Sequence, residues 1–264
     1  MPITHMDNMR INFKKLRRSG QFPTVVSAAR GIWQAQKNFR DLLVAPSAVS
    51  QIVSRARESS VEELIDPVVD GFHGLLRPIQ NKNELRSLLR VATERKPRFL
   101  LEIGTAKGGT LFLLSKAAQQ DATIISCDLP GGFYGGGYPR WKAILFRKLI
   151  PPPMKLHLIR GNSHEQKSYE TVRKILDGNL IDFALIDGDH SYAGVKQDFL
   201  LYRNLVRPGG SIAFHDILEN RFDIDIEVFR LWREIRDKYE TEEIIDDPLQ
   251  GQFGIGIVKV PLSW

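Results

Sequence analysis

Short apolar runs, each followed at once by glycine or a polar residue, recur along the chain. They are RFLLEIG, ATIISCDL, KLHLIRGNS, IDFALIDG and GSIAFHDI. Continuous apolar runs of this kind are typical of strands that are buried on both faces of a sheet. Stretches with helical spacing lie between them, around residues 140–149, 165–177, 191–206 and 225–238. The alternation predicts repeated strand–helix units, and therefore an α/β fold with a doubly wound, mostly parallel sheet.

The first part of the chain carries a different pattern. Val25, Val26, Ala29 and Trp33 recur at spacings of three and four, which is typical of helices. We therefore expect a helical N-terminal annex over residues 1–80 and an α/β domain over residues 81–264. The domain opens with the amphipathic stretch NELRSLLRVATER, and FGIGIVKV near its end predicts a last strand in an edge hairpin.

Composition narrows the class of protein. At 264 residues the chain is long enough for a full core. It has no apolar run of about 20 residues, and its start, MPITHMDNMRINFKKLRRSG, lacks the apolar core of a signal peptide. These features lead us to expect a cytoplasmic protein. The single cysteine, Cys127, has no internal partner for a disulfide, and its apolar surroundings predict a packed thiol.

The formal net charge of +6 has one concentrated source near the N-terminus. The residues are Arg10, Lys14, Lys15, Arg17 and Arg18. Such a patch is either a solvated basic tail or a weak contact for an anionic membrane surface. No RNA-binding or zinc motif accompanies it, so we expect no nucleic-acid partner.

The turn after the first strand, LLEIGTAKGGT, places glycines at positions 104, 108 and 109. Glycine there permits a positive φ and close approach of a ligand to the start of a helix. A dinucleotide loop has the pattern G-x-G-x-x-G, and Ala106 stands where its second glycine would be. This departure disfavours a nicotinamide-dependent oxidoreductase, the alternative enzyme class.

Glu102 and Gly104, together with Asp128 at the end of the second apolar run, resemble the cofactor motifs of class I S-adenosylmethionine-dependent methyltransferases. The resemblance implies a Rossmann-like, seven-stranded sheet, with Glu102 near the methionine part of the cofactor and Asp128 on the ribose hydroxyls. GNSH at 161–164 falls where the family contacts adenine, although Ser163 is equally suited to cap the helix that follows. The cofactor site that the resemblance implies comprises Glu102, Gly104, Thr105, Lys107, Gly108, Gly109, Asp128, Leu129, Asn162, Ser163 and Asp187.

Polar residues also follow the fourth and fifth apolar runs. Asp187, Asp189 and His190 come after one, and His215 and Asp216 end the other. Because adjacent parallel strands lie about 5 Å apart, both sets are expected to converge at one edge of the sheet. The alternative for each residue is a role in a turn, a helix cap or a buried histidine.

This second group resembles the divalent-metal-dependent O-methyltransferases, such as catechol and caffeoyl-CoA O-methyltransferases. The resemblance implies Asp187, His215 and Asp216 as metal ligands and Asp187 and His190 as catalytic residues, with His190 as the base. Histidine and aspartate replace the family's aspartate and asparagine, which leaves Mg²⁺, Mn²⁺ or a similar cation open. EIGTAKGGT, IDGDHSY and GGSIAFHD are also similar to segments of bacterial cephalosporin-hydroxylase and sugar O-methyltransferase groups, over about residues 76–260.

The function that this resemblance implies is transfer of a methyl group from S-adenosylmethionine to a hydroxyl of a small molecule, sugar or lipid. A non-catalytic, cofactor-binding or membrane-associated protein is the alternative outside the enzymes, and an oligomer is compatible with the sequence. Residues 130–138, within PGGFYGGGYPRW, are expected to form a mobile flap, with Phe133, Tyr134 and Tyr138 covering the acceptor.

Overall fold

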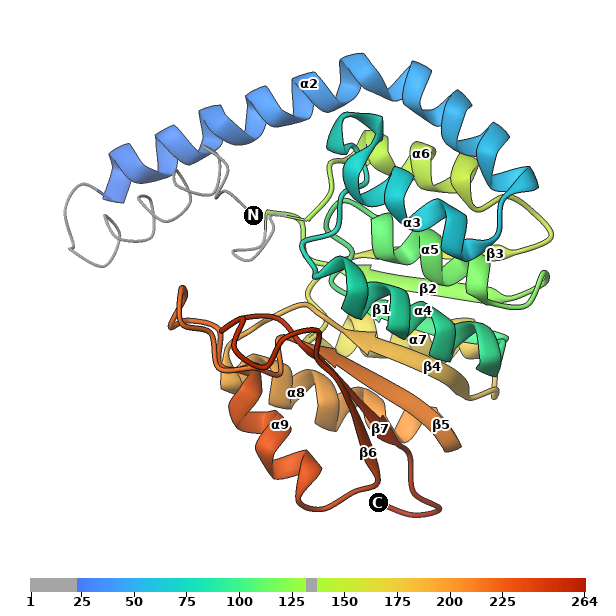
Figure 1. Ribbon diagram of the computed structural model, residues 1–264, viewed down its shortest axis with the longest axis vertical. Coiled ribbons are helices and arrows are strands. Elements are labelled where there is room, and N and C mark those ends of the chain that lie inside the picture. The colour runs from blue at the N-terminus through green and yellow to red at the C-terminus, as the bar shows by residue number, and fades with distance from the viewer. Residues whose placement is uncertain (1–22, 132–136) are drawn as a thin grey trace. The chain divides into compact units, whose positions relative to one another are not determined.

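The computed structural model describes residues 23–131 and 137–264. Its strands are β1 (Phe99–Ile103), β2 (Thr123–Asp128), β3 (Lys155–Arg160), β4 (Ile181–Ile186), β5 (Val206–His215), β6 (Thr241–Ile244) and β7 (Ile255–Lys259). They form one seven-stranded sheet in the order β3-β2-β1-β4-β5-β7-β6 (Figure 1). The first five strands are parallel, and β7 is antiparallel to both β5 and β6. The predicted α/β, Rossmann-like fold is confirmed.

Helices fill the connections between strands, as the sequence predicts. They are α2 (Pro23–Glu58), α3 (Val61–Asp70), η1 (Phe72–Gly74), α4 (Lys82–Arg95), α5 (Gly109–Ala117), α6 (Arg140–Leu149), α7 (Gln166–Leu176), α8 (Tyr192–Tyr202), η2 (Arg203–Leu205) and α9 (Val228–Arg236). Helices α4 and α5 cover one face of the sheet, and α7 and α8 cover the other (Figure 1). None of the helices in the described ranges is long and apolar enough to cross a membrane.

The continuous apolar runs form the central strands, because helices cover both faces of the sheet there. In β1, Leu100, Leu101 and Ile103 are each at most 1% exposed, and every residue of β2 is buried. Cys127 belongs to this core, as predicted, and burial raises the pKa of its thiol to about 12.

The end of the chain differs in detail from its prediction. The last strand, β7, does pair in a hairpin, but it lies between β5 and β6, so that β6 forms the edge of the sheet. The sequence TEEI of β6 is short and polar, with no buried residue. It therefore carries no apolar run from which a strand could have been predicted.

The chain divides into two compact units, Met1–Ser47 and Ala48–Trp264. The helical character predicted for the annex is found in α2, α3 and η1, whereas residues 1–22, with the basic patch, lie outside the described residues. Residues 48–80 belong to the larger unit together with the sheet. Within it, Lys116 Nζ donates to the carbonyl of Ala56 at 2.8 Å, and the buried Lys142 Nζ donates to that of Leu75 at 3.1 Å.

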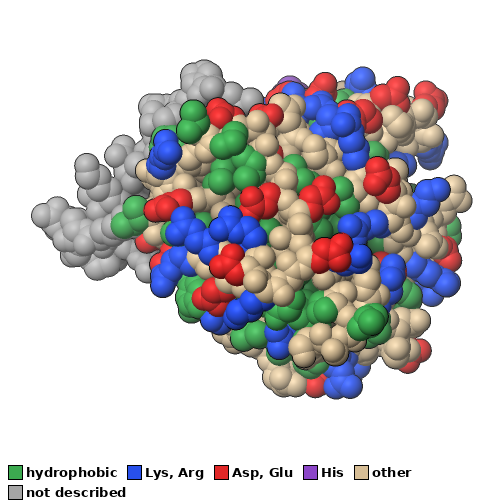
Figure 2. Space-filling view, turned by 60° about the horizontal axis from the view of Figure 1, so that its bottom comes forward, with side chains coloured by type: hydrophobic (Ala, Val, Ile, Leu, Met, Phe, Trp, Pro, Cys, Tyr) green, Lys and Arg blue, Asp and Glu red, His purple; other side chains and the backbone are tan. Residues whose placement is uncertain are grey.

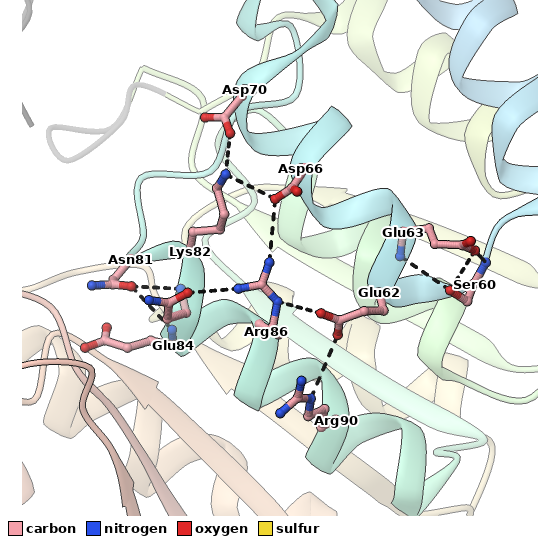
Figure 3. A network of polar contacts seen from close by, with 11 residues as sticks. Ser60, Glu62, Glu63, Asp66, Asp70, Asn81, Lys82, Glu84, Arg86 and Arg90 are labelled. Carbon is pink, nitrogen blue, oxygen red and sulfur yellow. Dashed lines mark hydrogen bonds and ion pairs between the residues drawn. The ribbon is translucent and has the colours of Figure 1, made fainter.

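Ion pairs connect α3 to α4 within the larger unit (Figure 3). Arg86 lies 2.5 Å from Glu62 and 3.6 Å from Asp66, and Lys82 pairs with Asp66 at 3.1 Å and with Asp70. Exposed pairs contribute little individually, but a network joining two helices limits how they shift. The network therefore helps to hold the N-terminal end of α4, which follows Gln80, in place near the carboxyl end of β4.

Candidate active site

The predicted site residues gather at the carboxyl ends of β1, β2, β4 and β5. The chain leaves β1 toward β2 on one side, while β4 lies on the other side, so the strand order reverses between β1 and β4. Open α/β sheets place their ligands in the crevice at such a reversal. The two strand ends are joined by a hydrogen bond from Asp187 N to Ile103 O at 2.8 Å.

The glycines of the turn after β1 are required by the close approach of other segments. Gly104 has φ +89°, and a Cβ there would lie 2.0 Å from the carbonyl oxygen of Asp187. Gly108 has φ +85° and faces the ring of Phe146. Gly109 opens α5, where a Cβ would lie 2.0 Å from the carbonyl oxygen of Leu76. The prediction of a tight turn with positive φ is confirmed at positions 104 and 108.

Glu102, the next-to-last residue of β1, is completely buried, and neither of its carboxylate oxygens has a hydrogen-bond partner among the described residues. Burial raises the pKa of Glu102 well above its usual range, and the charges of Asp187 and Asp128 raise it further, against a smaller opposing effect of the nearby Thr105 hydroxyl. A buried polar group without a partner is costly and usually has a functional reason. When it is ionised, as beside a cationic ligand group, Glu102 therefore offers two acceptor atoms at this turn.

Asp128 ends β2 and already accepts two backbone hydrogen bonds. Its Oδ1 accepts from Thr105 N at 3.3 Å and its Oδ2 from Tyr138 N at 3.1 Å. Burial raises its pKa to about 6, although these amides oppose the shift. Because a carboxylate has about four acceptor positions, Asp128 retains capacity for ligand hydroxyls while it holds the glycine turn.

The predicted flap is only partly described. Phe133 and Tyr134 lie outside the described residues. Tyr138 is 2% exposed, packs edge-on against Phe146 at 4.9 Å between ring centroids, and has the Arg160 guanidinium 5.0 Å from its ring. The ring of Tyr138 is thus buried against Phe146 of α6, and the mobility of residues 130–138 stays a prediction.

Three other predicted cofactor residues contact the chain itself or solvent. Thr105 Oγ1 lies 2.6 Å from Ser126 Oγ, Lys107 Nζ donates to Gly74 O at 2.6 Å, and Leu129 is 46% exposed. Thr105 and Lys107 thus brace the glycine turn. The Lys107 contact also joins this turn to residues that precede α4.

The turn after β3 is built by Asn162. Its Oδ1 accepts from His164 N at 3.0 Å, while the carbonyl of Ser163 accepts from Tyr202 Oη at 2.8 Å. Helix α7 has Glu165 at its N-cap position and no side-chain cap. Ser163 as a helix cap is therefore wrong, because the helix begins two residues further along the chain.

The polar groups after β4 and β5 converge into one cluster, as predicted. His190 Nδ1 lies 2.7 Å from Asp216 Oδ2, and His215 Nδ1 lies 3.1 Å from Asp187 Oδ1. His190 Nε2 lies 3.5 Å from Asp187 Oδ1, and the two imidazole rings meet edge to face with centroids 6.5 Å apart. We call Asp187, His190, His215 and Asp216 the His–Asp cluster.

Charge alternates within the His–Asp cluster. Burial opposes the charged form of both imidazoles, but the carboxylates of Asp216 and Asp187 outweigh it and raise the pKa of His190 and of His215. Burial would raise the pKa of Asp216, but the histidines outweigh that effect and hold it below its usual range. The cluster is thus a buried set of two carboxylates and two histidines that favour the protonated form.

Asp189 does not join the cluster. Its Oδ1 accepts from Ser191 N at 2.9 Å, and the Ser191 side chain caps α8 by accepting from Gly194 N at 3.1 Å. For Asp189 the turn-and-cap alternative is therefore correct, whereas Asp187 and His190 from the same loop face the sheet edge.

The predicted metal ligands, Asp187, His215 and Asp216, come together but do not form a metal site. No group of three or more His, Cys, Asp or Glu side chains within residues 23–131 and 137–264 is arranged to hold a metal ion. Within the cluster, His190 Nδ1 contacts Asp216 Oδ2 at 2.7 Å, and His215 Nδ1 lies 3.1 Å from Asp187 Oδ1.

Two residues at the site were missed by the sequence prediction. Gln80 Nε2 donates to Asp187 Oδ2 at 3.2 Å, and the Phe253 ring lies 5.7 Å from that of His215. Both are far from the cluster along the chain, in segments before α4 and before β7. Neither belongs to a local pattern, so only the tertiary structure reveals them.

Comparison with known proteins agrees with this geometry. Residues 101–217 match a family described as a methyltransferase domain. The matched segment runs from β1 to just beyond β5 and contains Glu102, Asp128 and the whole His–Asp cluster. The match agrees with the resemblance to methyltransferases that the sequence implies for this segment.

Among curated proteins, an uncharacterized protein of Acanthamoeba polyphaga mimivirus is 33% identical over 127 residues, which are 46% of this chain and 52% of the relative. The chain thus matches about half the length of this relative. Among solved structures, the O-methyltransferase TomG of Streptomyces achromogenes, in complex with S-adenosylmethionine, has a TM-score of 0.52 at 16% identity, covering 77% of this chain and 91% of that one. An O-methyltransferase of Bacillus cereus, in complex with S-adenosylhomocysteine, has a TM-score of 0.52 at 15% identity, with the same coverage. These similarities confirm the fold.

Proposed function

We propose that this chain, which carries a methyltransferase domain at residues 101–217, transfers a methyl group from S-adenosylmethionine to a hydroxyl oxygen. The observation that carries the proposal is a pair of buried acidic side chains on either side of a glycine turn, at the point where the strand order reverses. Glu102 has two acceptor atoms without partners, and Asp128 has remaining capacity for hydroxyls. The solved O-methyltransferases that resemble the chain were crystallised with S-adenosylmethionine or S-adenosylhomocysteine, which supports the same cofactor here.

The donor set fits this cofactor. Asp128 would accept hydrogen bonds from the two ribose hydroxyls, which charge assistance strengthens. Asn162 and Ser163, in the turn after β3, would contact adenine. When bound, S-adenosylmethionine supplies a methyl group on a positively charged sulfur, and the site's main task is to align the acceptor oxygen with it.

In its neutral form, His190 would remove the proton from the acceptor hydroxyl, and because its pKa is raised, that form gains population as the pH rises. Its Nδ1 is held by Asp216 at 2.7 Å, which fixes the orientation of the ring, and we place the proton transfer at Nε2, which lies 3.5 Å from Asp187 Oδ1. Asp216 would stabilise the imidazolium that results. Asp187 lies beside both histidines and would orient the reacting groups.

The acceptor that we propose is a small molecule, sugar or lipid with a hydroxyl group. The elements available to shape its pocket are the connections after β4, β5 and β6 together with the segment before α4. The space-filling view shows a surface of mixed charge, with acidic and basic side chains interspersed (Figure 2).

Metal assistance remains a prediction of the resemblance alone. The His–Asp cluster as arranged does not fit a divalent cation, so we derive no step through one. Methyl transfer measured in excess chelator is expected to continue at an undiminished rate, because His190 and Asp216 suffice for proton removal. Loss of turnover with chelator, together with recovery on adding Mn²⁺, would contradict this expectation and return Asp187, His215 and Asp216 to the role of metal ligands.

Calorimetric titration with S-adenosylmethionine tests the proposed function. We expect binding to the wild-type protein and no heat with NAD, because the turn lacks the dinucleotide pattern. Asp128→Ala should weaken the affinity about tenfold or more, since it removes charge-assisted hydrogen bonds worth roughly 1.5–3 kcal/mol.

Asp121→Ala is the matched control for this titration, because Asp121 is an exposed aspartate just before β2, paired with Arg98 at 3.4 Å. It should bind like the wild type. Equal affinities of the Asp128 and Asp121 variants would reject the ribose assignment.

A further inference from the structure

Gln80 reaches the site from a segment that precedes the matched methyltransferase domain. It lies between η1 and α4, and its Nε2 donates to Asp187 Oδ2 at 3.2 Å. Because an ionised carboxylate only accepts hydrogen bonds, this contact fixes which end of the amide is nitrogen. The amide oxygen is therefore the atom of Gln80 that remains for another partner.

That oxygen is buried and has no hydrogen-bond partner among the described residues. Glu102 is in the same condition with both of its carboxylate oxygens. Both residues lie near Asp187, because Gln80 donates to Asp187 and because Asp187 N donates to the carbonyl of Ile103, the residue after Glu102. The structure thus places three acceptor atoms without partners near Asp187. The imidazole beside this carboxylate, His215, has its Nδ1 3.1 Å from Asp187 Oδ1, so the three acceptors suit a ligand group with several donors.

We propose that Gln80 Oε1 accepts a hydrogen bond from the α-ammonium group of S-adenosylmethionine, alongside Glu102. This inference rests on the proposed function and adds a cofactor-binding residue from outside the matched domain. An ammonium has three N–H donors and one positive charge, and the charges acting on Glu102, those of Asp187 and Asp128, are both negative. An acceptor hydroxyl has a single donor and no charge, so it would satisfy fewer of these atoms.

The fold holds Gln80 rigidly enough for this task. The next residue, Asn81, caps α4 by accepting from Asn83 N at 2.8 Å (Figure 3). Glu84, 1% exposed, accepts from Gly254 N at 2.9 Å and from Gln250 Nε2 at 2.6 Å in the β6–β7 connection. A binding group that directly precedes a capped and anchored helix loses little freedom when its ligand arrives.

The test is calorimetry with two ligands, S-adenosylhomocysteine and its analogue that lacks the α-amino group. Gln80→Met keeps the length of the side chain and removes the amide. We expect it to weaken binding of S-adenosylhomocysteine about tenfold and to leave binding of the analogue unchanged. Ile79→Ala, at a neighbouring side chain that is 54% exposed, is the matched control and should bind both ligands like the wild type.

Each outcome has a distinct meaning. Unchanged affinity of Gln80→Met for S-adenosylhomocysteine would overturn the inference, and so would an equal loss for both ligands, which would point to an indirect effect through Asp187. Absence of S-adenosylhomocysteine binding to the wild-type protein would refute the proposed function instead. Thermal unfolding without ligand checks that Gln80→Met folds. If it does not fold, Gln80→Ala replaces it in the titration, and the same selective loss of S-adenosylhomocysteine binding is expected.

Discussion

Replacing His190 by alanine is expected to lower kcat by on the order of a hundredfold or more, with little change in the affinity for S-adenosylmethionine. The reason is that its Nδ1 is held by Asp216 at 2.7 Å, so the ring is oriented for proton transfer rather than for cofactor binding. The measurement is transfer of a labelled methyl group from S-adenosylmethionine to an acceptor found by screening hydroxyl compounds.

The matched control for this variant is His157→Ala. His157 is a partly buried histidine on β3, paired in register with Ile125 of β2 and therefore within the strand rather than at its carboxyl end. It should retain the wild-type kcat. Full activity of His190→Ala would show that His190 is not the general base and that it has only a structural role in its turn.

Gly104→Ala is expected to destabilise the protein by about 3 kcal/mol or more, because two unfavourable effects add at this position. The backbone has φ +89°, and the new Cβ would lie 2.0 Å from the carbonyl oxygen of Asp187, an atom that the sheet holds in place. The measurement is the free energy of unfolding from denaturant titration.

Gly178→Ala separates the two effects in that experiment. Gly178 has φ +81°, but a Cβ there meets nothing within 4 Å, so only the backbone strain of roughly 1–2 kcal/mol is expected. Equal destabilisation by the two substitutions would show that the contact between the ends of β1 and β4 is looser than described.

The sheet could be predicted from the sequence because its central strands are buried on both faces. IDFALIDG is a short continuous apolar run that ends at a glycine turn, so β4 and its carboxyl end follow from the pattern. The same does not hold for β6, where TEEI is short, polar and not buried. Edge strands that face solvent carry too little apolar signal for such a prediction.

The candidate site could be predicted as far as it depends on strand ends. Ile186 of β4 pairs with Phe214 of β5, and Asp187 and His215 are the residues that come directly after them. Their convergence therefore follows from a parallel sheet. Gln80 is different, because it meets Asp187 through tertiary packing across 107 positions of the chain. Local patterns likewise did not reveal that the ring of Tyr138 is buried, since the adjoining glycines suggested mobility.

The measurement that tests the central claim most directly is a crystal structure of the protein with S-adenosylhomocysteine. We predict one molecule across the carboxyl ends of β1 and β2, with its ribose hydroxyls on Asp128, its ammonium group at Glu102 and Gln80, and its sulfur turned toward His190. A crystal structure in which S-adenosylhomocysteine is absent from this position, or is bound away from Glu102 and Asp128, would contradict the proposed methyltransferase site.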